Sequence, residues 1–129
     1  IYVGGGHNAA GNDVNTVNRA RIQTGGALDN LTDTGQSFGG SGSAGYGVLA
    51  AAQQLFVFGG DQGLPSTKGV SASIINGAGN LANNSWNAGL SLGTARVFMG
   101  SSVQSAFAFF IGGRTNVDAA SKTTEFVVW

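Results

Sequence analysis

The chain has 129 residues, of which 42% are hydrophobic and only 9% are charged, and its six basic and six acidic residues cancel. This composition supports a packed core and argues against disorder, nucleic-acid binding and attraction to an anionic membrane. The absence of cysteine excludes disulfides, thiolate nucleophiles and thiolate metal sites, and no apolar run is long enough for a membrane-spanning helix.

A pair of glycines follows a short apolar run three times. The pairs are Gly5-Gly6, Gly59-Gly60 and Gly112-Gly113, and their second residues are 54 and 53 residues apart. A strand that ends in paired glycines and recurs about every fifty residues is typical of β-propeller repeats. We interpret the glycines as structural, because they permit positive φ and close backbone packing, and because no P-loop or strand-to-helix dinucleotide pattern surrounds them.

Alternating apolar and polar residues predict further strands in each repeat. We expect outer strands at 28–34 and 81–88, and inner strands at 46–52 and 96–103. The connections Gln53-Gln54 and Gln104-Ser105 are short enough to make each inner strand a hairpin partner of the next glycine-pair strand. Segments rich in Gly, Asn and Ser predict loops at 7–13, 35–42, 61–68, 89–94 and 114–121.

Four short antiparallel strands per repeat and no helix predict an all-β chain of about two and a half propeller blades. Two successive steps of 53 residues align Arg19 with Glu125 on one face of the third strands, and Ala20 with Phe126 on the other. We assign residues 1–40 to a partial first blade, 41–93 to a complete second blade and 94–129 to a partial third blade. A parallel β-solenoid, the alternative architecture, would show a sub-period of roughly 20–29 residues, and none is present.

The residues around the second and third glycine pairs resemble kelch repeats. Leu55–Asp61 is similar to the kelch glycine-pair strand, Thr94-Ala95-Arg96 resembles the opening of the innermost strand, and Trp86 precedes that arginine by ten residues, where kelch repeats carry tryptophan. The first repeat departs from this pattern, with Thr32 or Asp33 at the tryptophan position and Ser43 at the arginine position.

The resemblance to bacterial-type kelch repeats implies a propeller of five to seven blades that binds or scaffolds through its loops. Because two and a half blades cannot close a ring, the remaining blades or other chains are needed to complete it. Both ends of the chain lie inside apolar runs, so we expect a fragment of a larger protein.

The residues directly after the glycine pairs are the candidate binding residues. His7, Asp61 and Arg114 occupy equivalent positions, so we expect them to recur along one rim of adjacent blades. They would contact a protein or glycan partner. The alternative is that these polar loop residues vary without a binding role.

No pattern in the chain predicts catalysis, a cofactor or a metal. His7 and Asp13 could form an acid–base pair, but no nucleophile motif or oxyanion site accompanies them. Asn12-Asp13 and Asn116–Asp118 lack the spacing of a Ca²⁺ loop. The carboxylates available for glycoside hydrolysis are Asp29, Asp33, Asp61, Asp118 and Glu125, and we place the first two at the blade periphery.

The remaining candidates also have structural interpretations. We expect Arg19 and Arg21 to lie on a solvated face of an outer strand. Asn30 and Asn83 begin glycosylation sequons, which matter only in a glycosylating source. We expect inter-blade packing rather than carbohydrate stacking from the aromatic residues Trp86, Phe98, Phe107, Phe109 and Phe110.

These observations predict a non-catalytic module for binding, adhesion or assembly, in an extracellular or cell-surface protein. The low charge and the abundance of glycine and hydroxyl side chains suit an exposed extracellular surface. One alternative is a carbohydrate-active propeller enzyme whose catalytic residues lie in absent blades. Another is a structural subunit of a larger complex.

Overall fold

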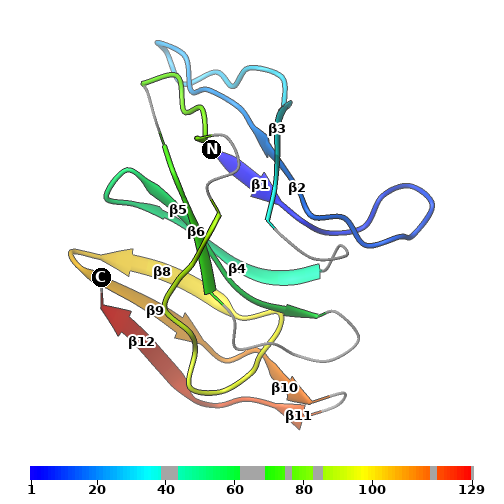
Figure 1. Cartoon of the computed structure of the whole chain (residues 1–129), viewed down its shortest axis with the longest axis vertical. Coiled ribbons are helices and arrows are strands. Elements are labelled where there is room, and N and C mark those ends of the chain that lie inside the picture. Colours follow the sequence, from blue (N-terminus) through cyan, green and yellow to red (C-terminus); the bar gives the residue numbers. More distant parts are fainter. Residues whose placement is uncertain (39–43, 62–68, 75–76, 83–85, 117–118, 129) are drawn as a thin grey trace.

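The chain folds entirely from β-strands in the part that the structure describes. This structure is a computed structural model, and it describes residues 1–38, 44–61, 69–74, 77–82, 86–116 and 119–128 (Figure 1). These residues contain no helix, and every strand pair among them is antiparallel. The all-β prediction is confirmed, and the antiparallel pairing excludes the rungs of a parallel solenoid.

Three antiparallel sheets follow one another along the chain. The first sheet has the order β1 (Tyr2–Gly4), β2 (Thr16–Arg19), β3 (Thr32–Ser37). The central sheet has the order β4 (Ala44–Ala51), β5 (Gln54–Asp61), β6 (Gly69–Ser73), β7 (Asn87–Ala88). The last sheet has the order β12 (Thr124–Val128), β9 (Phe107–Ile111), β8 (Gly100–Gln104), and β10 (Arg114–Asn116) pairs with β11 (Ala119–Ala120).

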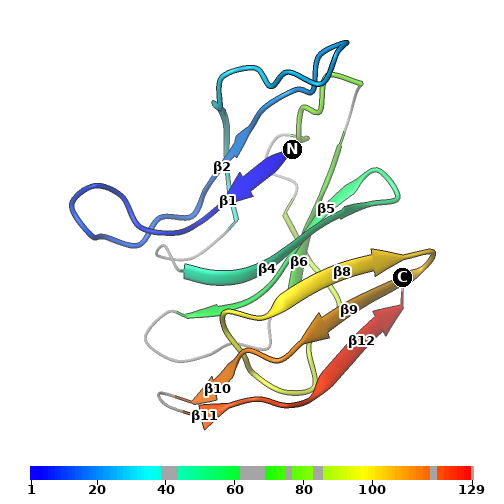
Figure 2. The same ribbon diagram turned by 180° about the vertical axis from the view of Figure 1, so that it is seen from behind.

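The first and last of these sheets have three strands each and the central sheet has four, and the described residues do not close the ring of a propeller. The division into blades therefore stays a prediction. Figures 1 and 2 show the central sheet between the first sheet and the last. The kelch identity and the propeller therefore stay predictions.

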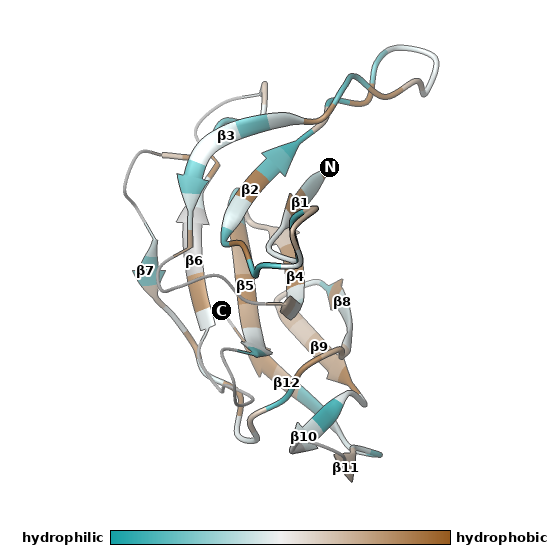
Figure 3. Ribbon diagram, turned by 90° about the vertical axis from the view of Figure 1, so that its right-hand side faces the viewer, coloured by the Kyte–Doolittle hydropathy of each residue, from teal (hydrophilic) through white to brown (hydrophobic). Residues whose placement is uncertain are grey.

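Strand β5 divides its side chains between two cores, because successive residues of a strand point to opposite faces. Leu55 and Val57 pack with Val17 and Phe38 of the first sheet. The other core joins the central and last sheets through Leu49, Phe56, Phe58, Leu92, Met99, Ala108 and Phe110. Figure 3 shows the resulting contrast between the hydrophobic β5 and the more polar β3 at the edge.

All three glycine pairs have the same backbone conformation. Their φ angles are 69° and 100° at Gly5-Gly6, 70° and 90° at Gly59-Gly60, and 66° and 86° at Gly112-Gly113. The first and third pairs also share a hydrogen bond, since the Gly5 N–H donates to the Thr16 carbonyl at 3.1 Å and the Gly112 N–H donates to the Thr123 carbonyl at 3.0 Å. Their conformation lies in the region that favours glycine.

The register corrects our alignment of the third strands. Arg19 pairs with Tyr2, and Phe126 occupies the same place opposite Phe109. Arg19 is therefore equivalent to Phe126, and our alignment with Glu125 was wrong. A slip of one residue transfers a side chain to the other face of the sheet.

Several element boundaries also differ from the predictions. The inner strand predicted at 96–103 begins only at Gly100, and the predicted loop at 114–121 contains the β10–β11 hairpin. The first hairpin turn is Ala52-Gln53 instead of Gln53-Gln54, with φ of 47° and 56°. Turn residues with positive φ match the twist of the flanking strands, which decides this register.

Candidate functional site

The three residues that follow the glycine pairs lie along one edge of the stacked sheets. His7 follows the pair after β1, Asp61 ends β5 and Arg114 begins β10. Figure 1 shows the loop after β1, the end of β5 and the β10–β11 hairpin on the right, and Figure 2 shows them on the left from behind. We call this edge the glycine-pair rim.

Asp61 and Arg114 meet across the boundary between the central and last sheets. The Arg114 Nη2 atom lies 3.6 Å from the Asp61 Oδ2 atom, and both side chains are partly exposed. His7 instead pairs within its own loop, where its Nδ1 atom lies 2.7 Å from the Asp13 Oδ1 atom. The structure thus brings together two of the three candidate binding residues.

Phe98 adds an exposed aromatic ring beside this ion pair. The residue is 61% exposed, and the Arg114 guanidinium carbon lies 5.5 Å from its ring centroid. Its φ of 54° is rare for a bulky residue, and its N–H donates to the Gly45 carbonyl at 2.8 Å. We call Asp61, Phe98 and Arg114 the rim patch.

Backbone hydrogen bonds hold the rim patch in place. Val97 and Arg114 exchange two of them, at 2.9 and 2.8 Å, and the Gly60 N–H donates to the Arg96 carbonyl at 3.3 Å. The segment before β8 is therefore bonded to both neighbouring glycine-pair strands. The patch belongs to a rigid part of the sheets, which lowers the entropy that a partner must remove on binding.

Arg96 is a structural residue beneath the rim. Its side chain is fully buried, and it donates to the Gly112 carbonyl at 3.0 Å, to the Thr123 hydroxyl at 3.1 Å and to the Glu125 carboxylate. Although burial alone would raise the pKa of Glu125, hydrogen bonds from Thr94, Gly93 and Arg96 lower it below its ordinary value. Arg96 is consequently not accessible to a ligand.

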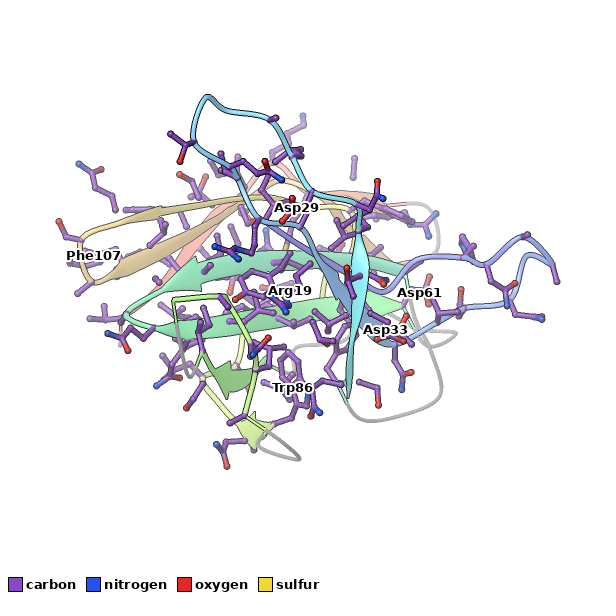
Figure 4. All side chains as sticks on the ribbon, turned by 90° about the horizontal axis from the view of Figure 1, so that it is seen from above. Arg19, Asp29, Asp33, Asp61, Trp86 and Phe107 are labelled. Atoms are coloured by element: carbon purple, nitrogen blue, oxygen red, sulfur yellow. The ribbon has the colours of Figure 1, made fainter. Side chains whose placement is uncertain are left out.

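Of the phenylalanines expected to form inter-blade core, Phe110 is buried between two sheets, whereas Phe98 and Phe107 are exposed in this chain. Phe110 is fully buried against the Phe58 ring at a centroid distance of 4.6 Å. Phe107 is 41% exposed and, as Figure 4 shows, lies on the opposite side of the molecule from Asp61. Trp86 packs edge-on to Phe38, with centroids 5.6 Å apart.

An apolar face of the last sheet is open to solvent. The β9–β12 pairing puts Phe107, Phe109 and Phe126 on one side of the sheet, with ring centroids 5.9 to 6.3 Å apart. Ile111 and Val128 are exposed on the same side. We call these five residues the outward face. Sequence reasoning missed it, because alternation alone does not say which face is covered.

No metal centre emerges from the described residues. They contain no group of three His, Asp or Glu side chains that could hold a metal ion. Asp33 lies on the edge strand β3, as expected for the periphery, and Asp29 is hydrogen-bonded to Gln23. Asp118 and the sequon residue Asn83 lie outside the described part of the chain.

Comparisons with known proteins leave the chain without an assigned family. No protein-family model matches it, and no curated protein is significantly similar to it. Within the described residues, no helix is long and apolar enough to cross a membrane.

Proposed function

We propose that this chain is a non-catalytic binding or assembly module of an extracellular or cell-surface protein, and that it contacts a protein or glycan partner through the glycine-pair rim. The rim patch is the observation that carries this proposal. It combines an acidic group, a guanidinium and an exposed ring within one small area. Such a combination offers hydrogen-bond donors and acceptors around an apolar ring, which suits the binding of a partner without catalysis.

The conformation of Phe98 supports the same conclusion. In the preceding repeat the equivalent residue is Gly45, which has φ of 73° without strain. Phe98 adopts this conformation with a large side chain and remains exposed. A strained residue persists where its surroundings impose the conformation, and such residues cluster at functional sites.

A binding experiment tests the rim directly. We expect the wild-type chain to bind members of a glycan array or a panel of immobilised extracellular matrix proteins, and Arg114→Gln and Phe98→Ala to weaken that binding at least tenfold. Phe107→Ala is a matched control, because it removes one exposed ring on the opposite side of the molecule from Asp61 (Figure 4). Equal binding by all four proteins, or no binding to either panel, would contradict the proposal. Turnover of a bound glycan by the wild type would favour the enzyme alternative instead.

We further propose that the chain belongs to a kelch-like propeller, in which another sheet of the same repeat covers the outward face. By register, Phe109 and Ile111 are equivalent to Phe56 and Phe58, counted back from the glycine pairs. Phe56 and Phe58 are buried against the last sheet. The outward face of the last sheet is therefore suited to being covered by another sheet, as the equivalent face of β5 is covered by the last sheet.

Self-association tests whether another sheet packs on the outward face. When the chain is studied alone, a second copy can supply that sheet. We expect sedimentation to reveal concentration-dependent association that Phe126→Glu abolishes. Asp33→Lys on the edge strand β3 should leave the association unchanged. A wild-type chain that remains monomeric at high concentration would contradict the assignment.

A further inference from the structure

A hollow of about 270 Å³ lies between the first and central sheets, at the other end of β1 from its glycine pair. Its lining comes from the start of β1, the end of β2 with the residues after it, and the segment 77–79 of the central sheet. The hollow is therefore bordered by two repeats. It is separate from the rim patch, which lies where the central and last sheets meet.

Two hydrogen bonds between the sheets shape the hollow. The Tyr2 hydroxyl donates to the Gly79 carbonyl at 2.7 Å, and the Arg19 guanidinium donates to the Ala78 carbonyl. Burial raises the pKa of Tyr2, although the charge of Arg19 opposes this effect. Arg19, which we expected on a solvated face, is half-buried and contacts the neighbouring repeat through the Ala78 carbonyl. These two hydrogen bonds hold the walls of the hollow together.

The charge of the hollow is positive and uncompensated. Arg19 and Arg21 line it, and no carboxylate does. Within the described residues, the Arg21 side chain makes no ion pair or hydrogen bond, while the Arg21 carbonyl accepts a hydrogen bond from the Asp29 N–H at 3.0 Å. Asp29 borders a smaller neighbouring hollow of about 80 Å³, also lined by both arginines, and its carboxylate accepts a hydrogen bond from Gln23. In a chain with so few charges, two arginines on one concave surface form an anion site.

The shape and lining indicate the class of anion. A guanidinium presents two parallel donors that bind a carboxylate or a phosphate bidentately. The volume is slightly below that of typical ligand pockets, which begin at about 300 Å³, so the ligand is of the size of a single sugar or amino acid. Exposed Ile22 provides an apolar edge, while Asn30 and Thr32 of the neighbouring hollow provide polar groups.

We propose that this hollow binds a small hydroxylated carboxylate, such as a uronic-acid unit of a polysaccharide, with Arg21 as the main carboxylate ligand and Arg19 as the second. Among the described residues the Arg21 side chain has no partner to give up, so its donors are available to the ligand. Arg19 keeps its bond to the Ala78 carbonyl and uses its remaining donors. The apolar edge at Ile22 contacts the C–H face of the sugar ring.

Titration calorimetry with glucuronate tests the proposal, with glucose as the neutral match and glucose 6-phosphate as the competing phosphate anion. We expect millimolar binding of glucuronate, at least tenfold weaker binding of glucose, and weaker glucuronate binding at higher salt. Arg21→Gln should reduce the affinity about tenfold, because it removes charge-assisted hydrogen bonds. Lys122→Gln, which removes one exposed positive charge between β11 and β12, should leave the affinity unchanged.

Three results would overturn the proposal: equal binding of glucuronate and glucose, tighter binding of glucose 6-phosphate than of glucuronate, or an Arg21→Gln protein that binds as the wild type does. Arg21→Lys keeps the charge but loses the planar fork, so we expect it to recover only part of the affinity. The circular-dichroism spectrum of each variant verifies that the protein is folded. The rim variants do not affect this site, so failure of the rim proposal and failure of this one are distinguishable.

Discussion

The two boundaries between sheets use similar apolar cores but different cross-links. The first–central boundary is cross-linked by side chains, with Tyr2 and Arg19 donating to carbonyls of the central sheet. The central–last boundary adds backbone links, in which the Phe98 N–H donates to the Gly45 carbonyl and the Gly60 N–H donates to the Arg96 carbonyl. Its side-chain contacts join Arg114 to Asp61 and Ser101 to the Val48 carbonyl. Backbone links permit close approach and hold the rim patch, whereas longer side-chain links leave room for the hollow. Repetition of the apolar faces thus allows different binding surfaces at each boundary.

The largest loss of stability should come from truncating a side chain in the core between the central and last sheets. Phe110→Ala removes a fully buried ring, so we expect the free energy of unfolding to fall by about 3–5 kcal/mol. Urea unfolding measures this change. Leu55→Ala is the matched truncation on the other face of the central sheet, with an expected loss of about 2–5 kcal/mol. A negligible loss for either variant would mean that its boundary does not contribute to a cooperative fold.

Substitution of Gly60 should have the next largest effect. A Cβ at this position would lie 2.3 Å from the Tyr46 ring, and φ is 90°. We expect Gly60→Ala to destabilise the chain by about 3 kcal/mol through overpacking and backbone strain together. Gly6→Ala is the control, because φ is 100° there but nothing lies within 4 Å of the added Cβ. It should lose only about 1–2 kcal/mol, and equal losses would contradict the role of the Tyr46 contact.

Glu125→Gln should produce a smaller, pH-dependent loss. The variant weakens charge-assisted hydrogen bonds to Arg96 and Gly93, so we expect a decrease of roughly 2 kcal/mol in the free energy of unfolding at neutral pH. Because folding lowers the pKa of Glu125, its contribution is complete above the ordinary glutamate pKa and is lost as the pH falls through the folded value.

Unfolding curves at several pH values check this sign. The difference between wild type and Glu125→Gln should shrink as the solution becomes acidic. Asp33→Asn, on the exposed edge strand, is the control for general charge effects. A difference that grows in acid would contradict the hydrogen-bonded carboxylate.

The smallest change should come from Tyr2→Phe at the side-chain-linked boundary. Loss of the hydrogen bond to Gly79 should lower the free energy of unfolding by about 1 kcal/mol. Folding raises the pKa of Tyr2, so this stabilisation is complete below the ordinary tyrosine pKa of about 10 and is lost as the pH rises through the folded value. Thermal unfolding of both proteins at neutral and alkaline pH measures the difference, and a constant difference would contradict the buried hydroxyl.

Local sequence patterns were sufficient to predict the all-β class, the three glycine-pair strands and the equivalent positions of Asp61 and Arg114. These features depend on alternation, paired glycines and spacing. Such local patterns follow directly from the two-residue period of a strand and from the length of the repeat. The burial of Phe110 and the packing of Trp86 followed from the same patterns.

Contacts between the sheets, in contrast, set which equivalent residues meet and which faces of the sheets remain exposed to solvent. Phe98 and Phe110 are both phenylalanines near a glycine pair, yet one is exposed in a left-handed conformation and the other is buried. The face of Arg19 depended on a one-residue register, and the hollow beside it depends on the distance between two sheets. Such features arise from contacts between residues far apart in the chain, which no local period encodes.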